Sequence, residues 1–379
     1  MRFEFATATR IVFGEGASRE VAPLAATLGR RPLVVTGATA DRTAPLVASL
    51  KAAALAVAGE PTIDFVRQGA AFARAEGCDV VIAIGGGSAI DAGKALAAML
   101  TNPGDPMDYL EVIGAGKPLE RASAPFIAIP TTAGTGSEVT RNAVLASPAA
   151  RVKASLRSAS MLPRVALVDP ELTWGLPRSV TASTGLDALT QLIEPYVSVR
   201  ANPMTDLFCV EGIRRAAGAL PRAWEDGAGR DARADMAWAS LLGGLSLANA
   251  ALGAVHGFAA PVGGMFPAPH GAVCAAMLPH AIEINIRALR ERSPASQALR
   301  RYEEVARLVT GRPHATADEG AEWIAQLVRK LEIPPLRTYG VTEGDIPVLV
   351  EKAAKASSMK GNPIVLTEEE LREIIVQAI

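Results

Sequence analysis

The 379-residue chain has almost no net charge, only three cysteines and one long stretch without any charged side chain. Its 38 basic and 39 acidic residues leave a net charge of −1. Proteins that bind nucleic acids over large surfaces depend on a basic excess, so the balance argues against a nucleic-acid partner. A chain with 49% apolar and 20% charged residues is also not a disordered one.

The three cysteines, Cys78, Cys209 and Cys274, are far apart in the sequence. They lack the spacing of a metal-binding motif, so we interpret them as buried thiols of a protein in a reducing compartment. The N-terminal MRFEF carries an acidic residue at position 4, and no apolar run follows it. We therefore expect no signal peptide and a cytoplasmic location.

Residues 236–282 contain no Asp, Glu, Lys or Arg, yet they include His256, His270 and His280. A membrane-spanning helix would need roughly 20 predominantly apolar residues. Four prolines and many glycines interrupt this stretch, which argues against a span. We interpret it as two buried helices, one ending near His256 and one opening at His270, joined by a Gly/Pro turn.

The first part of the chain alternates strand and helix patterns. Helical spacing is predicted over residues 40–53 and 89–100, and a strand expected between residues 50 and 61 is poorly defined. This alternation is typical of a parallel sheet with helices on both faces. Short apolar runs predict strands at 32–36, 79–84, 126–129, 141–146, 152–156 and 165–168.

From about residue 178 onward, apolar residues recur at helical spacing and strand patterns almost vanish. The predicted helices cover 181–197, 203–217, 231–252, 270–286, 297–309, 315–331, 344–357 and 367–378. The sequence therefore predicts an α/β domain over residues 1–177 and an all-α domain over residues 178–379. Ligands commonly bind between two such domains and at the carboxyl ends of parallel strands.

Two polar, glycine-rich turns follow two of the predicted strands. GGGSAID, residues 85–91, precedes a helix whose free amides and dipole attract phosphate, with Ser88 as a candidate cap; a tight turn without a ligand is the alternative. PTTAGTGSE, residues 130–138, offers hydroxyl groups that could line a cofactor. Neither turn matches the GxGxxG fingerprint. Because both turns follow strands of one sheet, we expect them to lie at the same edge, and together they favour a nucleotide site.

Asp187, Gln191 and Glu194 are spaced i, i+4 and i+7 on a predicted helix, so they share one face. A carboxylate and two imidazoles form a common catalytic metal set that leaves one coordination position open for substrate. We take Asp187, His256 and His270 as candidate ligands and catalytic residues, with Gln191 as a fourth, weaker oxygen ligand. A histidine within an apolar helix is otherwise usually a core residue.

Four motifs, taken in their order along the chain, resemble the iron-containing (group III) alcohol dehydrogenase family. They are GGGSAID, PTTAGTGSE, TGLDALTQLIEPYVS and AVHGFAAPVGGMFPAPHG. The resemblance covers essentially the whole chain. It implies a dinucleotide-binding α/β domain, a helical domain and a divalent metal. It also implies a homodimer that interconverts alcohols with aldehydes or ketones using NAD or NADP.

Carried over by position, the resemblance implies that the first glycine-rich turn holds the cofactor pyrophosphate. Thr131, Thr132 and Thr135 would contact the cofactor, and Lys153 would reach its nicotinamide ribose side. The residues implied to bind the cofactor through the first turn and its helix are Gly85, Gly86, Gly87, Ser88 and Asp91.

Three positions depart from the family pattern. Gln191 stands where the family usually has a histidine ligand, and Ala260 where many members have another histidine. The remaining Asp-His-His set is like that of the related glycerol dehydrogenases, which use zinc, and a neutral amide binds Fe²⁺ less well than imidazole does. Gly37 replaces an acidic residue of NAD-preferring relatives, so Thr39 or Arg42 could contact a 2′-phosphate and NADP should be accepted.

The sequence thus predicts a metal-dependent, NAD(P)-linked alcohol dehydrogenase or aldehyde reductase that contains iron or zinc. Apolar residues around the second predicted ligand suggest an uncharged pocket for a small neutral alcohol or aldehyde. One alternative is a dehydroquinate-synthase-like lyase, although residues 236–282 offer no basic group for a phosphorylated substrate. A second alternative is a non-catalytic NADP-binding homologue, which is suggested by the departures from the family pattern at Gln191 and Ala260.

Overall fold

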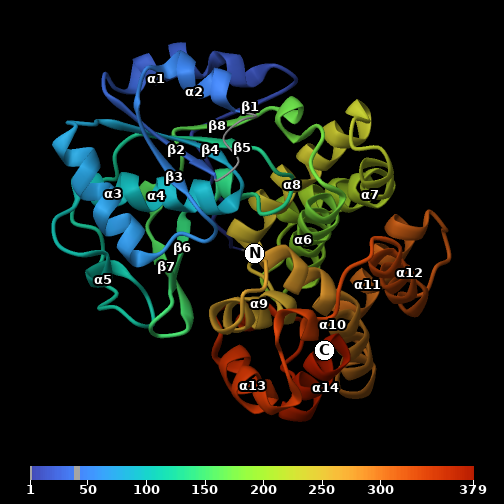
Figure 1. Cartoon of the computed structure of the whole chain (residues 1–379). Coiled ribbons are helices and arrows are strands. Elements are labelled where there is room, and N and C mark those ends of the chain that lie inside the picture. The colour runs from blue at the N-terminus through green and yellow to red at the C-terminus, as the bar shows by residue number, and fades with distance from the viewer. Residues whose placement is uncertain (1, 38–42) are drawn as a thin grey trace. The chain divides into compact units, whose positions relative to one another are not determined.

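The computed structural model describes residues 2–37 and 43–379, so Thr39 and Arg42 lie outside the described residues. The chain divides into two compact units. We call the first, Ala6–Thr132 with Gly136–Trp174, the α/β unit. The second, the helical unit, consists of Met1–Phe5, Ala133–Thr135 and Gly175–Ile379. Figure 1 shows the elements of each unit.

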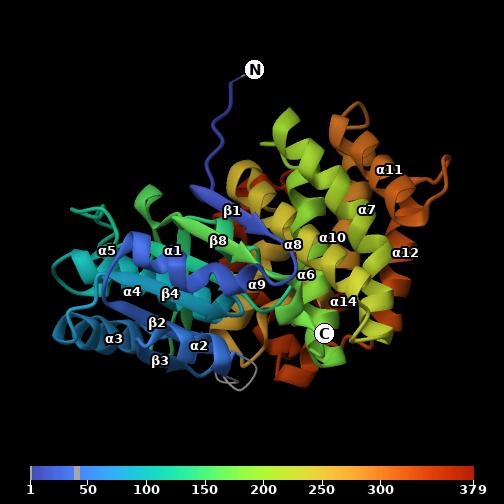
Figure 2. The same ribbon diagram turned by 90° about the horizontal axis from the view of Figure 1, so that it is seen from above.

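The α/β unit is built on a six-stranded sheet with the strand order β1-β8-β5-β4-β2-β3. All of its pairings are parallel, which confirms the predicted α/β architecture. Figure 2 shows β1 and β3 at opposite edges of the sheet. The strands are β1 (Arg10–Phe13), β2 (Pro32–Gly37), β3 (Ala53–Val57), β4 (Val80–Gly85), β5 (Phe126–Pro130) and β8 (Val165–Val168).

Helices cover both faces of this sheet, because successive residues of a strand point to opposite sides and are apolar on both. Val34 and Ile82 face the core that α1 and α2 complete. Leu33 and Val81 face the core that α3 and α4 complete. The helices of this unit are α1 (Val21–Leu28), α2 (Ala44–Leu50), α3 (Ile63–Ala75), α4 (Gly87–Thr101) and α5 (Pro106–Tyr109).

Two predicted strands do not belong to the parallel sheet, and the poorly defined segment between residues 50 and 61 does form a strand of it. The strands expected at 141–146 and 152–156 are β6 (Asn142–Ser147) and β7 (Val152–Arg157), an antiparallel pair outside the parallel sheet. Their short connection permits a hairpin, whereas a parallel crossover needs a dozen or more residues. The strand between residues 50 and 61 is β3, whose partial burial at the sheet edge explains its weak apolar pattern.

The helical unit surrounds one long buried helix, α6, against which α7, α8 and α10 pack. A capping box formed by Thr367 and Glu370 starts α14. The helices are α6 (Arg178–Val197), α7 (Pro203–Glu225), α8 (Arg230–Ala250), α9 (Ala254–Met265), α10 (His270–Arg292), α11 (Gln297–Thr310), α12 (Ala317–Lys330), α13 (Ile346–Lys355) and α14 (Glu368–Ala378).

The Gly/Pro turn expected between His256 and His270 is mostly helix. The preceding helix ends at Ala250 and not near His256, because Ala251 adopts a φ of 63°. The chain bends by 99° before α9 begins. Pro261 lies inside α9, whose Phe258 and other apolar side chains are buried. Burial of an apolar face thus stabilises this helix despite residues that usually interrupt one.

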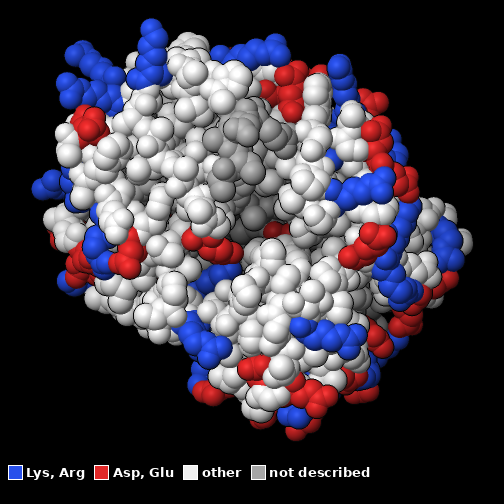
Figure 3. Space-filling model, viewed as in Figure 1, with Lys and Arg blue, Asp and Glu red and all other residues white. Residues whose placement is uncertain are grey.

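One helix of the described residues, α10, is long and apolar enough to cross a membrane. However, 83% of its most apolar window is buried inside the protein. The uncharged residues 236–282 therefore form part of the interior of the helical unit. On the face shown in Figure 3, basic and acidic side chains are interspersed and form no single basic patch.

A buried cluster of charged side chains joins α4 to the segment that follows β5. Lys94 is fully buried, and its Nζ donates to Thr140 Oγ1 at 2.8 Å and to the Asn142 carbonyl at 2.7 Å. Asp91 lies 3.3 Å from the same nitrogen. Burial lowers the pKa of Lys94 and raises the pKa of Asp91. Burial also raises the pKa of nearby Glu138 to about 7.

We expect Glu138→Gln to become relatively more stable than the wild-type protein as pH rises. Because the pKa of Glu138 is raised in the folded state, its favourable contribution is complete below about pH 4.5 and lost as pH passes 7. The difference in free energy of unfolding should change by about 2–3 kcal/mol between pH 5 and pH 8.5. Urea denaturation at both pH values measures it. Asp91 and Lys94 titrate in both proteins, and exposed Glu76→Gln is the control. A pH-independent difference would mean that Glu138 is ionised when folded.

Candidate functional site

The carboxyl ends of β2, β4 and β5 bring three predicted cofactor segments together. Gly37 ends β2, and Gly85 ends β4. The Thr131 amide, just after β5, donates to the Gly85 carbonyl at 3.0 Å. A Cβ atom on Gly85 would lie 2.5 Å from the Ala89 Cβ and 3.2 Å from the Gly37 nitrogen. Only glycine fits this close approach of neighbouring backbones.

The strand order reverses between β2 and β4. The connection that leaves β2 leads to β3 on one side, whereas the connection that leaves β4 leads to β5 on the other. In open α/β sheets, ligands bind beyond the carboxyl ends of the strands at such a reversal. Gly37 and Gly85 lie at this point, so the topology supports a nucleotide site there.

The first turn of α4 provides backbone donors at the same edge. Helix α4 begins at Gly87 with Gly86 as its N-cap, so the prediction that Ser88 caps the helix is wrong. Ser88 instead lies in the first turn, where amides have no partner within the helix and the dipole favours anions. No acidic side chain occupies this turn. A Cβ on Gly86 would lie 3.4 Å from Thr132 Oγ1, which brings the second turn beside the first.

Of three other predicted cofactor residues, two have hydrogen-bond or ion-pair partners within the protein, and the third is grouped with the helical unit. The Asp91 carboxylate accepts hydrogen bonds from Lys94, the Ser137 hydroxyl and the Val144 amide. Lys153 is buried with its Nζ 2.7 Å from Glu60 Oε1. Thr135 belongs to the segment that is grouped with the helical unit. Contacts of these residues with a cofactor stay predictions.

Four potential metal ligands lie together in the helical unit. Asp187 comes from the middle of α6, His256 from the first turn of α9, and His270 and Cys274 from the first two turns of α10. Each offers one donor atom, and all four atoms lie within 4.8 Å of one another. The structure thus brings the three predicted ligands together and adds a cysteine.

The Asp187 carboxylate is buried, and its Oδ1 has no hydrogen-bond partner among the described residues. This oxygen lies 3.4 Å from His256 Nε2 and 3.7 Å from His270 Nε2. A buried carboxylate oxygen that faces two imidazole nitrogens can be satisfied by a protonated ring or by a bound cation. Within the part of the chain that the structure describes, Gln191 Oε1 is also buried and has no hydrogen-bond partner, and its ligation stays a prediction.

Glu194 fixes the orientation of the His256 ring. Its Oε2 lies 2.6 Å from His256 Nδ1, and its Oε1 accepts the Val255 amide at 2.8 Å. Because Nδ1 is engaged by a carboxylate, the tautomer assigned to a neutral ring leaves Nε2 free to bind a metal. The carboxylate also lies at the N-terminus of α9, where the helix dipole stabilises negative charge.

Contacts with segments that are distant in the sequence hold both histidine-bearing helices in place. Asn362 Oδ1 accepts the Ala254 amide at 3.1 Å and so caps the start of α9. Asn285 from α10 also donates to this oxygen, at 3.2 Å. At the start of α10, a Cβ on Gly271 would lie 2.7 Å from the Ser183 carbonyl of α6. Glycine after His270 therefore allows the close approach of α10 to α6.

Negative charge around the two imidazoles favours protons or a metal cation. Burial by itself lowers the pKa of His256, but Cys274, Glu194 and Asp187 outweigh it and raise the pKa well above its ordinary value. Burial likewise opposes protonation of His270, yet Cys274 and Asp187 raise its pKa to about 9. Burial tends to raise the pKa of Asp187, but the two histidines lower it.

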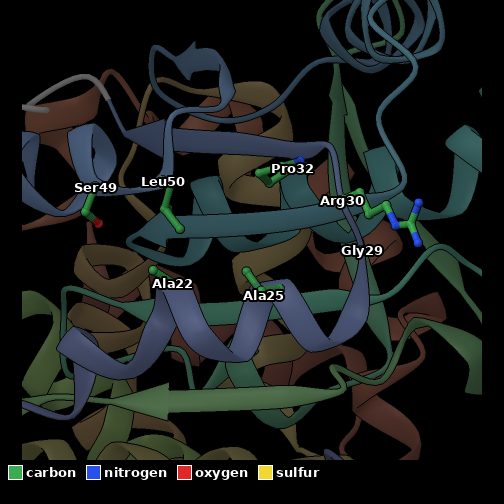
Figure 4. A pocket seen from close by; sticks show the side chains of 8 residues that line it. Ala22, Ala25, Gly29, Arg30, Pro32, Ser49 and Leu50 are labelled. Carbon is green, nitrogen blue, oxygen red and sulfur yellow. The ribbon is translucent and has the colours of Figure 1, made fainter.

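Two further observations bear on where a substrate could reach the site. Ala260, the departure from the family pattern, is exposed and one turn after His256 on α9. Phe258 and Val262, expected beside an uncharged pocket, are fully buried in the core. A pocket of about 380 Å³ between α1, α2 and β2 contains none of the predicted site residues (Figure 4). Its lining is largely apolar, and we assign no catalytic role to it.

The sequence-based prediction missed Cys274 and the role of Glu194. Cys274 lies four residues after His270, so the two share one helix face, and this spacing was a usable signal. Glu194 shares the face of α6 with Asp187, but its contact with His256 depends on the unforeseen helix α9. The interpretation of Cys274 as a thiol without metal spacing is therefore incomplete.

The chain is similar to known proteins along nearly its whole length. Residues 8–170 match the iron-containing alcohol dehydrogenases, and residues 181–379 match the C-terminal part of the Fe-containing alcohol dehydrogenase family. The chain belongs to the iron-containing alcohol dehydrogenase family. It is accordingly an oxidoreductase that acts on CH–OH groups, as predicted. Membership implies a nicotinamide cofactor and a divalent metal.

Individual relatives cover most of the chain. Alcohol dehydrogenase 4 of Schizosaccharomyces pombe is 40% identical over 319 residues, which are 84% of this chain and 73% of that protein. The NAD-dependent methanol dehydrogenase of Bacillus methanolicus is 34% identical over 97% of both chains. A crystal structure of a 1,3-propanediol oxidoreductase is 33% identical, with a TM-score of 0.89 over 100% of both chains.

We expect Glu194→Gln to weaken metal binding by about 10- to 100-fold, because the carboxylate that orients His256 is replaced by a neutral amide. Competition with a chromophoric chelator measures the dissociation constant. Exposed Glu303→Gln, elsewhere in the helical unit, is the control and should bind metal like the wild type. Unchanged affinity in Glu194→Gln would show that the 2.6 Å contact with Nδ1 does not position the ligand.

Proposed function

We propose that this enzyme interconverts small neutral alcohols and aldehydes, accepts NADP(H), and uses Asp187, His256 and His270 to hold its metal. The observation that carries the proposal is the unpartnered Asp187 Oδ1, which faces the Nε2 atoms of both histidines. A second observation supports the nucleotide part of the proposal: Gly37 and Gly85 lie at the edge of the sheet where the strand order reverses.

The three ligand side chains fit a divalent metal. One carboxylate and two neutral imidazoles are donors that suit a divalent metal, and three such ligands leave room for a substrate oxygen. When bound, the metal supplies Lewis-acid polarisation of that oxygen. Glu194 holds His256, and the close contact at Gly271 holds His270, so both rings are positioned before substrate arrives.

Acceptance of NADP(H) follows from the end of β2. Gly37 provides no carboxylate that would repel a 2′-phosphate. A Cβ at this position would meet nothing within 4 Å among the described residues. The cofactor itself carries the hydride, and the protein's part is to position it.

The substrate is proposed to be uncharged because residues 236–282, which contribute two ligands, contain no charged side chain to bind a carboxylate or phosphate. Ala260, on the same face of α9 as His256, has no group that could transfer a proton, so no protein general base is assigned there. The absence of basic residues also argues against the lyase alternative, and the assembled ligands argue against the non-catalytic one.

We also propose a cytoplasmic homodimer. Strand β1 lies at the edge of the sheet and pairs with β8 alone within the described chain. An edge strand of this kind exposes backbone donors and acceptors that a second copy can use, and symmetric dimers are the commonest oligomers.

Replacement of Asp187 tests the metal-dependent activity. We expect Asp187→Asn, even when supplied with excess metal, to lower kcat/KM for alcohol oxidation by about 1000-fold or more, since metal polarisation contributes several kcal/mol. Steady-state kinetics measure the activity, and NADPH fluorescence titration should show unchanged cofactor binding. Exposed Asp231→Asn is the control. Wild-type activity in metal-replete Asp187→Asn would refute the metal function.

Replacement of Gly37 tests the cofactor preference. We expect Gly37→Asp to lower kcat/KM for NADPH relative to NADH by about tenfold or more, because a carboxylate would repel the 2′-phosphate. Gly37→Asn has the same size without the charge and should retain the use of NADPH. If both variants lose NADPH equally, the effect is steric. If neither does, Gly37 is not near the 2′-phosphate.

A further inference from the structure

We propose that Cys274 supplies a fourth donor to the metal site, as a thiolate, and that the site thereby prefers Zn²⁺ to Fe²⁺. The inference builds on the proposed metal function of Asp187, His256 and His270. It assigns a ligand that replaces the imidazole missing at Gln191, from a different helix.

The distances between donor atoms support this assignment. The Cys274 Sγ lies 3.8 Å from His256 Nε2 and 3.7 Å from His270 Nε2. Asp187 Oδ1 lies 3.4 Å and 3.7 Å from the same two nitrogens. In a tetrahedral zinc site with bonds of about 2.0–2.1 Å to nitrogen or oxygen and 2.3 Å to sulfur, neighbouring donors lie about 3.3–3.6 Å apart. Of these four separations, one lies within that range and three lie slightly above it, and all four donor atoms are within 4.8 Å of one another.

A simple hydrogen bond from the thiol explains the arrangement less well. One S–H group can donate to only one acceptor at a time, but the sulfur is nearly equidistant from both Nε2 atoms and also interacts with the Asp187 carboxylate. Neither of those nitrogens is the one that Glu194 engages on His256. The fully buried sulfur and the unpartnered Asp187 oxygen therefore converge on the same two Nε2 atoms, which a cation between them would join.

A thiolate donor determines which metal is favoured. Soft sulfur ligands suit Zn²⁺, whereas a site of harder oxygen and nitrogen ligands is more favourable for iron. A charged thiolate also binds Zn²⁺ more strongly than the neutral amide of Gln191, so Cys274 is the stronger fourth donor. On metal binding the thiol releases its proton to solvent, and the thiolate forms the bond to the metal.

The cluster remains accessible on one side. The side chain of His270 is 33% exposed, whereas those of Asp187 and His256 are 1% and 6% exposed. Cys274 is fully buried, so the thiolate lies on the interior side and leaves the His270 side for a substrate oxygen. Zinc in catalytic sites can expand to five ligands, so a fourth protein donor is compatible with turnover.

Two measurements on the full-length protein test the assignment. With Co²⁺ in the site, wild type should show a near-ultraviolet thiolate-to-cobalt charge-transfer band. Cys274→Ser should lack this band, while Cys209→Ser, a buried thiol on α7, and Gln191→Leu should retain it. The zinc dissociation constant of Cys274→Ser should rise by more than the roughly 10- to 100-fold expected when a ligand's hydrogen-bond partner is lost.

X-ray absorption at the zinc edge of the wild-type protein provides a test that does not depend on the folding of a variant. We expect one sulfur neighbour at about 2.3 Å. A bound zinc without sulfur, or a cobalt band that survives in Cys274→Ser, would overturn the assignment while the metal function stands. Failure of wild type to bind any divalent metal would overturn both.

Discussion

The buried carboxylate of Asp187 imposes a requirement that the surrounding helices must meet. An ionised carboxylate in the interior is very unfavourable unless positive charge or hydrogen-bond donors accompany it. Residues 236–282 contribute α9 and the first turns of α10 without any Lys or Arg. Compensation must therefore come from the two imidazoles or from a bound cation, and this constraint explains why a stretch so poor in charge contains two closely placed histidines.

The α/β unit depends on a different constraint, the close approach of backbone segments at the ends of neighbouring strands. Gly85 contacts the turn after β5 and lies against Gly37. Lys94, about two turns after the start of α4, ties this helix to the segment around Thr140. The buried Lys94 side chain therefore helps to fix the position of α4. The backbone amides that α4 offers to a ligand are in its first turn, some distance from Lys94.

Much of this organisation could be predicted from the sequence. The apolar runs of the parallel strands were sufficient to predict the fold class. The helix that carries Asp187 and the two histidines in an uncharged stretch, together with the family resemblance, predicted three candidate metal ligands, which the structure brings close together. These signals are local, because strand burial and helix faces follow from periodicity. The family resemblance gave the activity.

The errors arose where tertiary contacts outweigh local preference. Helix α9 contains Pro261 and several glycines, which made it read as a turn, but burial of Phe258 stabilises it as a helix. The pair β6 and β7 was assigned to the parallel sheet because apolar spacing does not reveal strand direction. Cys274 was overlooked since its partners lie on three helices, and sequence spacing shows only the one to His270.

The cap that Asn362 places on α9 also bears on how the site is assembled during synthesis. Its partner, the Ala254 amide, precedes it by 108 residues. Asn362 also exchanges hydrogen bonds with Asn285, so it joins the two helices that carry the histidines. A nascent chain that has emerged only through α10 contains all four potential ligands but lacks the residue that anchors α9. The arrangement of the four donor atoms therefore depends on the late segment around Asn362 as well as on the three helices that carry them.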